Sequence, residues 1–263
     1  MTLHNSKRYH KKYALKHIIR ILHYNISEVL IMKKIYTCMP LKEKHKKLLE
    51  SSSSNYEFIH LGQIKPSLEQ VKDANVIIGN IPVDILKNIP NLEFVQLNSA
   101  GTNGYSDNPD FPKNVLLANA TGAYGVAISE CILAGILTLM KHMPSYIQNQ
   151  SNYEWKDEGS VKSIYNSNIL VLGLGDIGKE FSKRAYAMGA HITGIKRNIK
   201  DKPDYIDKLC TMDSLYDELE KADIIVSSLP GSKSTYHLLG EEALAHVKKQ
   251  PIFVNVGRGS FVL

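Results

Sequence analysis

The amino-acid sequence predicts an α/β protein made of two domains, each built around a parallel sheet. From Met32 onward, short β-branched runs alternate with longer amphipathic or polar stretches, a pattern typical of parallel strands joined by crossover helices. A length of 263 residues is usually divided in two in α/β proteins. In the second half, a glycine-rich turn joins a buried apolar run to a charged, helix-like stretch. These observations predict two parallel sheets covered by helices.

The first domain is predicted over residues 32–125. Its five candidate strands are KIYTC (34–38), YEFIHL (56–61), NVIIG (75–79), LEFVQL (92–97) and VLLAN (115–119). Between them, KEKHKKLLESSS and DILKNI have the composition of helices that end at polar residues, glycine or proline. The turn ATGAYG precedes an apolar helix that begins near Ala127, and we expect this helix to form the hinge between the domains.

The second domain is predicted over residues 126–263. Its candidate strands are NILVLG (168–173), AHITGI (190–195), ADIIVSSL (222–229) and PIFVNVG (251–257). The segment DIGKEFSKRAYAMG predicts a helix with Ile177, Phe181 and Met188 on its inner face. The apolar run VAISECILAGILTLM contains Glu130 and is shorter than the roughly 20 residues that a membrane span needs, so it predicts a buried helix and no membrane partner.

The positive charge is concentrated at the N-terminus. The formal net charge is +6, but residues 1–31 hold six lysines and arginines against one acid, Glu28. The remainder is nearly neutral, which argues against a nucleic-acid partner. A lysine-rich targeting peptide is one interpretation of residues 1–31. We favour a disordered or non-native extension, with synthesis starting at Met32.

The cysteines indicate a reducing compartment. Cys38, Cys131 and Cys210 are far apart and form no C-x-x-C motif, so neither a disulfide framework nor a zinc site is predicted. We therefore expect a cytoplasmic protein without a bound metal.

The stretch ILVLGLGDIGKEF contains the motif G-x-G-x-x-G directly after a predicted strand and at the start of a predicted helix. Gly173 permits a tight turn, Gly175 allows a pyrophosphate to approach the main chain, and Gly178 allows the helix and strand to pack closely. The alternative is a purely structural turn. We predict a dinucleotide site that also includes the intervening residues Asp176 and Ile177.

The next predicted strand ends in GIKRN, where an NAD site usually carries an acid for the ribose hydroxyls. Here the positions hold Lys196, Arg197 and Asn198. A lysine–arginine pair neutralises a 2′-phosphate that an acid would repel, so the sequence favours NADP over NAD. A solvated basic turn is the alternative.

Three segments together resemble the D-isomer-specific 2-hydroxyacid dehydrogenases: LGLGDIGKEFSKRAYAMGAHITGIKRN, ADIIVSSLPGSKSTYHLL and FVNVGRGSFV. In the first domain, VQLNSAGTNGY and ATGAYGVAISECILAGILTLMK resemble the family's substrate loop and interdomain helix. The resemblance implies a flavodoxin-like substrate domain, a Rossmann-like NAD(P)-binding domain and a homodimer. It also implies reversible hydride transfer between a nicotinamide and a 2-oxo or 2-hydroxy acid.

The resemblance also assigns site residues. Arg258 matches the catalytic arginine, whose planar fork suits a carboxylate and polarises the adjacent carbonyl. The alternatives are an ordinary surface arginine at Arg258, a plain glycine-rich turn at residues 99–101 and, at Pro230, a proline that merely ends a strand. The substrate loop is Ser99, Ala100 and Gly101, and the further cofactor residues are Pro230, Thr235, Val256 and Gly257.

The sequence departs from the family pattern after Arg258. The family places a glutamate and a histidine downstream of this arginine, whereas this chain has five more residues. We therefore expect a truncated member with an incomplete Rossmann-like domain, an exposed apolar edge at PIFVNVGRGSFVL and little or no turnover. The alternative function is that of a non-catalytic NAD(P)-binding protein of the corepressor or sensor type.

Overall fold

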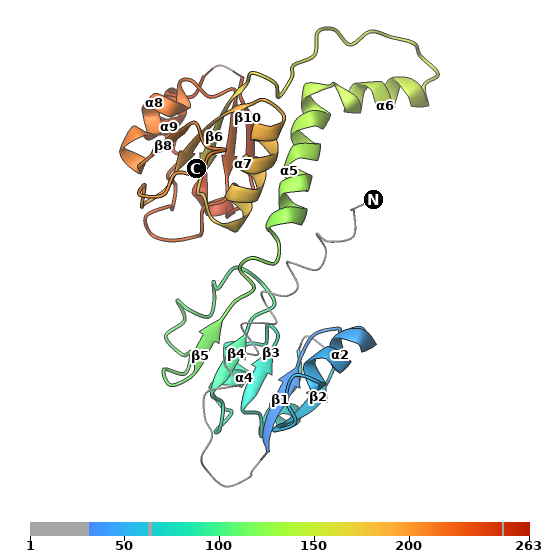
Figure 1. The fold of residues 1–263 in the computed structure, drawn as a ribbon, viewed down its shortest axis with the longest axis vertical. Helices are drawn as coiled ribbons and strands as arrows, with labels where there is room; N and C mark the ends of the chain where they lie inside the picture. Colours follow the sequence, from blue (N-terminus) through green and yellow to red (C-terminus); the bar gives the residue numbers. More distant parts are fainter. Residues whose placement is uncertain (1–31, 63–64, 249) are drawn as a thin grey trace. The chain divides into compact units, whose positions relative to one another are not determined.

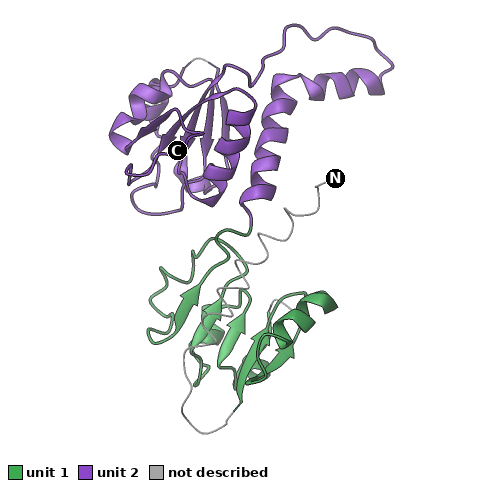
Figure 2. Cartoon of the chain, in the orientation of Figure 1, with its two compact units in different colours: residues 1–123 green, residues 124–263 purple. Residues whose placement is uncertain are grey.

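The computed structural model describes residues 32–62, 65–248 and 250–263. The predicted basic extension, residues 1–31, lies outside the described residues. The chain divides into two compact units, one up to Ala123 and the other from Tyr124 to Leu263 (Figure 2). Each unit holds one five-stranded sheet.

The sheet of the first unit is parallel throughout, in the order β2-β1-β3-β4-β5 (Figure 1). The strands are β1 (Lys33–Thr37), β2 (Tyr56–His60), β3 (Val76–Ile78), β4 (Phe94–Gln96) and β5 (Leu116–Ala118). The helices are α2 (Glu43–Glu50), α3 (Leu68–Val71) and α4 (Val83–Leu86). All five predicted strands are present, and the strand order is that of flavodoxin-like sheets, as the resemblance implies.

Both faces of this sheet are covered by apolar side chains. Ile77, Val95 and Leu97 belong to one buried cluster, whereas Ile35 and Phe94 belong to a second. Burial on both faces explains why the strands of this unit are nearly continuous apolar runs, because a parallel sheet has no solvent face to carry polar residues.

The sheet of the second unit is also parallel, in the order β10-β9-β6-β7-β8. The strands are β6 (Asn168–Leu172), β7 (His191–Ile195), β8 (Lys208–Cys210), β9 (Ile224–Ser227) and β10 (Ile252–Asn255). This order is the Rossmann arrangement, which confirms the predicted fold class. The sequence did not predict β8, because its residues, KLC, lie next to charged residues, whereas the equally short β3, β4 and β5 lie within longer apolar runs. As predicted, the apolar run at β10 forms an edge strand, which pairs with β9 alone among the described strands.

The longest helix of the second unit, α5, packs along α7, and their apolar faces share a buried cluster with one face of the sheet (Figure 1). The helices are α5 (Gly125–Met140), α6 (Met143–Ser151), α7 (Asp176–Ala187), α8 (Leu215–Leu219) and α9 (Glu241–Ala245), with 3₁₀ turns η1 (Met212–Ser214) and η2 (Gly259–Phe261). No single helix among the described residues is long and apolar enough to cross a membrane, whereas α5 and α6 together, bent by 67°, meet the length and composition of one.

Candidate functional site

The turn between β6 and α7 is shaped by three glycines. Gly173 has a φ of +94°, which favours glycine over residues with a side chain. A Cβ on Gly178 would lie 2.0 Å from the carbonyl oxygen of Gly173, so only glycine lets the helix approach the strand end this closely. A Cβ on Gly175 would meet nothing within 4 Å, so the main chain there is open to a ligand. The turn combines tight local packing with exposed backbone.

The loop after β9 packs directly against this turn, and the loop after β10 packs against the loop after β9. The Ser228 hydroxyl donates a hydrogen bond to the Gly173 carbonyl at 2.8 Å. A Cβ on Gly257 would lie 2.4 Å from the carbonyl oxygen of Leu229, so the loop after β10 also depends on a glycine. Three strand ends therefore form one continuous edge of the sheet, at the switch point between β6 and β9 where parallel α/β sheets bind ligands. We call the loops after β6, β7, β9 and β10 the carboxyl edge of the second unit.

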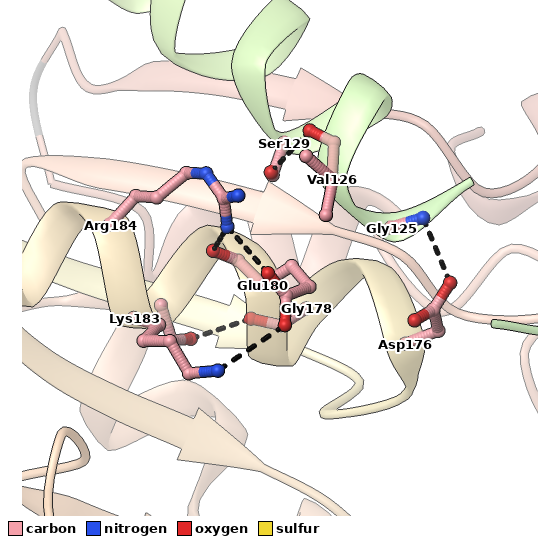
Figure 3. A network of polar contacts seen from close by, with 9 residues as sticks. Gly125, Val126, Ser129, Asp176, Gly178, Glu180, Lys183 and Arg184 are labelled. Atoms are coloured by element: carbon pink, nitrogen blue, oxygen red, sulfur yellow. Dashed lines mark hydrogen bonds and ion pairs between the residues drawn. The ribbon is translucent and has the colours of Figure 1, made fainter. Parts of the chain in front are cut away.

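Asp176 is the first residue of α7, but its carboxylate does not cap that helix. The carboxylate accepts a hydrogen bond at 2.9 Å from the backbone N–H of Gly125, the first residue of α5 (Figure 3). A Cβ on Gly125 would lie 2.6 Å from this carboxylate, so the contact requires glycine. The sequence prediction placed Asp176 in the cofactor site; in the structure its side chain is bound to α5, and its N–H remains at the open start of α7.

Further along α7, charged side chains form a local network. Burial alone would raise the pKa of the Glu180 carboxyl, but hydrogen bonds from Arg184 and Lys183 outweigh burial and hold the pKa below its usual range (Figure 3). Glu180 therefore stays ionised, and its charge is matched one turn further along the same helix.

The predicted basic residues follow β7 and begin beside the glycine turn, because the Gly173 N–H donates to the Ile195 carbonyl at 3.0 Å. Lys196 is half-buried, and its ammonium lies 3.5 Å from the Asp201 carbonyl. The Asn198 side chain accepts the Lys200 N–H at 3.0 Å. Arg197 is exposed, and its guanidinium makes no hydrogen bond or ion pair with the described residues. A cation without a partner is therefore available next to the turn.

The loop after β9 is closed by Thr235, which is buried. Its hydroxyl donates to the Pro230 carbonyl at 2.7 Å and accepts the Ser232 N–H at 2.9 Å. The hydroxyl is therefore used to hold the loop in shape.

Arg258 follows β10 in a turn fixed by Asn255. The Asn255 side chain accepts the Gly257 N–H at 3.0 Å and donates to the Arg258 carbonyl at 2.8 Å. The Val256 N–H donates to the Ser227 carbonyl at 2.9 Å, which continues the ladder between β9 and β10 by one step. The backbone that carries the guanidinium is thus tied to the sheet.

Among the described residues, no histidine paired with a carboxylate lies at the carboxyl edge. His237 stacks on Tyr236 with 3.8 Å between ring centroids and has no carboxylate partner among the described residues. His246 does pair with Glu220 at 2.8 Å, but Glu220 precedes β9 and so belongs to the opposite, amino end of the sheet.

In the first unit, Ser99, Ala100 and Gly101 form a loop after β4. The Ala120 N–H donates to the Ser99 carbonyl at 2.9 Å, the Asn119 side chain donates to the Ala100 carbonyl at 2.8 Å, and the Ser99 hydroxyl donates to the Gly101 carbonyl at 2.8 Å. The N–H groups of Ser99, Ala100 and Gly101 donate no hydrogen bond to any described residue. A loop whose carbonyls are bound and whose amides are open is suited to an anion.

The structure thus gathers the predicted residues of the second unit on one edge and leaves the loop of residues 99–101 as a separate element of the first unit. Four polar residues that hold these loops were not predicted from the sequence: Asn80, Asn119, Ser228 and Asn255. Each lies one or two residues beyond a strand or at its last position. The sequence does show a polar residue at each of these strand ends. It does not show which loop that residue binds, because the loop follows another strand.

Among known proteins, residues 133–262 match the model of the NAD binding domain of the D-isomer specific 2-hydroxyacid dehydrogenases. The chain is 27% identical over 238 residues to D-3-phosphoglycerate dehydrogenase of Methanocaldococcus jannaschii, covering 88% of this chain and 45% of that protein. It is 25% identical over 207 residues to glyoxylate reductase of Pyrococcus horikoshii, covering 74% of this chain and 62% of that protein. The chain thus spans less than two thirds of the length of these relatives.

Solved structures share the fold. A D-isomer specific 2-hydroxyacid dehydrogenase family protein of Aeromonas salmonicida has a TM-score of 0.78 at 21% identity, covering 88% of this chain and 75% of that one. A glyoxylate/hydroxypyruvate reductase of Sinorhizobium meliloti, solved with NADP and sulfate, has a TM-score of 0.73 at 20% identity, with coverage of 88% and 74%. D-lactate dehydrogenase of Aquifex aeolicus, solved with NAD and lactic acid, has a TM-score of 0.68 at 18% identity, with coverage of 88% and 70%. The predicted resemblance is confirmed: residues 133–262 belong to the NAD binding domain of the D-isomer specific 2-hydroxyacid dehydrogenase family, and the similarity to its members extends over 88% of the chain.

Proposed function

We propose that this chain binds NAD(P) and transfers hydride between the nicotinamide and a small 2-oxo or 2-hydroxy acid, as an oxidoreductase of the D-2-hydroxyacid dehydrogenase type. Residues 126–263 are assigned to the nucleotide and residues 32–125 to the substrate. The observation that carries the proposal is the β6–α7 turn, where Gly173 and Gly178 pack in backbone contact while Gly175 stays open. This cradle fits a pyrophosphate at a helix N-terminus.

The residues of the chain would bind and orient both reactants. When bound, the nicotinamide supplies or accepts the hydride. Arg258, on a turn fixed by Asn255, provides a planar fork for the acid's carboxylate and polarises the adjacent carbonyl. The amides of residues 99–101 are assigned to the carboxylate. The remaining predicted contacts with the nucleotide come from Ile177, Pro230, Thr235, Val256 and Gly257.

We further propose NADP as the preferred nucleotide. Lys196, Arg197 and Asn198 follow β7 beside the glycine turn, and the Arg197 guanidinium has no partner among the described residues. A free guanidinium favours a 2′-phosphate, whereas NAD carries only a hydroxyl there. The relatives do not decide the preference, since the structure from Sinorhizobium meliloti contains NADP and the one from Aquifex aeolicus contains NAD.

The preference is tested with a Lys196→Asp, Arg197→Ala double variant. We expect NADPH to bind the wild-type chain at least tenfold more tightly than NADH, and this ratio to fall to about one or below in the variant. Affinities are measured by fluorescence titration of each reduced nucleotide. An unchanged ratio in the variant would refute the assignment of the basic residues.

The activity is tested by mixing the chain with NADPH and glyoxylate or pyruvate and following the loss of absorbance of the reduced nucleotide. Loss of absorbance that depends on the acid and disappears in Arg258→Ala supports the enzyme. A second candidate is a non-catalytic nucleotide-binding protein, because the described residues place no histidine–carboxylate pair at the carboxyl edge. Tight NADPH binding without turnover would establish it, and absence of NADPH binding would refute both.

We also propose a homodimer in the cytoplasm. After α6, Tyr153 and Trp155 are almost fully exposed, while Asn149 beside them is buried and bound to Glu158 at 2.7 Å. Two aromatic side chains held in solvent by an ordered segment indicate a contact surface. Cys38, Cys131 and Cys210 are free thiols, which fits a reducing compartment. Light scattering should give twice the chain mass of 29.5 kDa, and Trp155→Ser should lower it.

A further inference from the structure

Two asparagines hold the loop of residues 98–101 from opposite sides. β4 lies between β3 and β5 in the sheet, Asn80 follows β3, and Asn119 follows β5. The Asn80 side chain accepts the Asn98 N–H at 2.9 Å and donates to the Ser99 hydroxyl at 2.9 Å. The Asn119 side chain donates to the Ala100 carbonyl at 2.8 Å. Neighbouring strand ends thus fix both halves of the loop.

The direction of these hydrogen bonds determines what the loop can bind. Asn80 donates to the Ser99 hydroxyl, so the hydroxyl proton is directed to the Gly101 carbonyl. Each carbonyl from Ser99 to Gly101 therefore accepts a hydrogen bond from a donor of the first unit itself, whereas the N–H groups of these three residues have no acceptor among the described residues. The loop therefore offers N–H donors to a ligand, and each of its three carbonyls already accepts a hydrogen bond. Such a loop accepts a carboxylate, which only accepts hydrogen bonds, and disfavours a carboxamide, whose NH₂ requires an acceptor.

We propose that Asn80 and Asn119 are positioning residues that preorganise the amides of Ser99, Ala100 and Gly101 for a carboxylate and give this site its preference for carboxylates over carboxamides. The inference rests on the proposed function, which places the substrate acid at this loop. Preorganisation raises affinity because the loop loses no conformational freedom on binding, and no carbonyl has to be turned away from the anion.

The chain contains a matched control for a merely structural role. Asn75 also joins two segments of the first unit, accepting the Lys34 N–H at 3.0 Å and donating to the Asn91 carbonyl at 3.2 Å. These contacts lie at the amino ends of β1 and β4, so they are remote from the loop after β4. Asn75→Ala removes the same amide and a similar number of hydrogen bonds without touching the loop.

The test follows the backbone amide NMR signals of the full chain during titration with pyruvate and, separately, with pyruvamide, at saturating NADP⁺. In the wild type we expect pyruvate to shift the signals of residues 99–101 and pyruvamide to leave them in place. Asn80→Ala and Asn119→Ala should each weaken pyruvate binding about tenfold, whereas Asn75→Ala should change it less than twofold. Asn119→Asp keeps the size of the side chain, removes its donor and adds a negative charge, so it should weaken binding at least as strongly as Asn119→Ala does.

The outcomes separate the two proposals. If pyruvate binds the wild type at residues 99–101 but equally well in the asparagine variants, or if Asn75→Ala weakens it as strongly, the positioning role is refuted and the proposed function stands. Equal binding of pyruvamide refutes the carboxylate preference. If neither NADP⁺ nor pyruvate shifts any signal of the folded wild type, the proposed function itself fails. Signals outside the loop and the midpoint of thermal unfolding confirm that each variant is folded.

Discussion

The two units present open main-chain amides at the carboxyl ends of their strands by different means. In the second unit, glycines remove side chains so that Gly178 can approach Gly173 and the backbone at Gly175 stays exposed. In the first unit, Asn80 and Asn119 occupy a loop's hydrogen-bonding groups so that only its amides remain open. The missing side chains of the glycines and the hydrogen bonds of the asparagines thus both leave main-chain N–H groups open. The first device is visible as a sequence motif, and the second is not.

The supporting elements also differ. The second unit has helices of 16 and 12 residues, α5 and α7, packed along each other, whereas the longest described helix of the first unit has eight residues. Long amphipathic helices bury a large continuous face. A glycine turn can therefore be held rigidly by the packing of α7, whereas the loop of the first unit needs explicit side-chain hydrogen bonds.

The largest effect is expected from Gly178→Ala. The added Cβ would overlap the Gly173 carbonyl at 2.0 Å, and backbone on both sides cannot yield as a side chain would. We expect the second unit to lose about 3 kcal/mol of stability or more, together with NADPH binding. Urea unfolding and fluorescence titration measure both.

Gly135→Ala is the matched control, since Gly135 is exposed within α5 and its Cβ would meet nothing within 4 Å. It should be neutral or stabilise the protein by about 0.5–1 kcal/mol through helix propensity. If both variants behave alike, steric exclusion is not what shapes the turn.

A smaller effect, confined to the first unit, is expected at alkaline pH. Burial, followed by the hydrogen bond to Asp73 at 2.7 Å, raises the pKa of Tyr36 to about 12. Because the folded pKa lies above the ordinary value of about 10, the stabilisation is complete below pH 10 and is lost as the pH rises towards 12. Its size is on the order of 2 kcal/mol.

Tyr36→Phe should reduce this pH dependence in urea unfolding curves recorded between pH 9 and 11. A smaller dependence should remain, because burial also raises the pKa of the Cys38 thiol, to about 11. Unfolding of the second unit, followed by the loss of its folded-state backbone amide NMR signals, should be unchanged by the same substitution. A wild-type curve that is flat over this interval would show that Tyr36 does not lose its proton on unfolding.

The smallest effect concerns Asp176. Its carboxylate lies in the first turn of α7, where a pyrophosphate would otherwise meet only positive partial charges. Asp176→Asn keeps an oxygen acceptor for the Gly125 N–H and removes the charge, so NADPH affinity should rise about fivefold, or about 1 kcal/mol.

Asp217→Asn serves as the control for this charge change, because Asp217 is also an acid in the first turn of a helix of the second unit. It should leave NADPH affinity within about twofold. Weaker NADPH binding in Asp176→Asn would instead show that the carboxylate supports the site through α5.

The sequence by itself determined the two parallel α/β units, nine of their ten described strands, the glycine turn and the basic residues after β7. These features follow from local periodicity and from steric limits within a few residues. The strand β8 was not predicted, because its three residues lie outside any apolar run.

Only the tertiary structure decided which distant groups meet at the strand ends. Asp176 binds Gly125 rather than the start of its own helix, Ser228 binds Gly173 across 55 residues, and Asn80 and Asn119 meet around a loop that lies between them in the sequence. Strand order sets these pairings, because parallel strands that are far apart in the chain end side by side at the same edge. A polar residue at a strand end acquires its role only when the neighbouring strand is known.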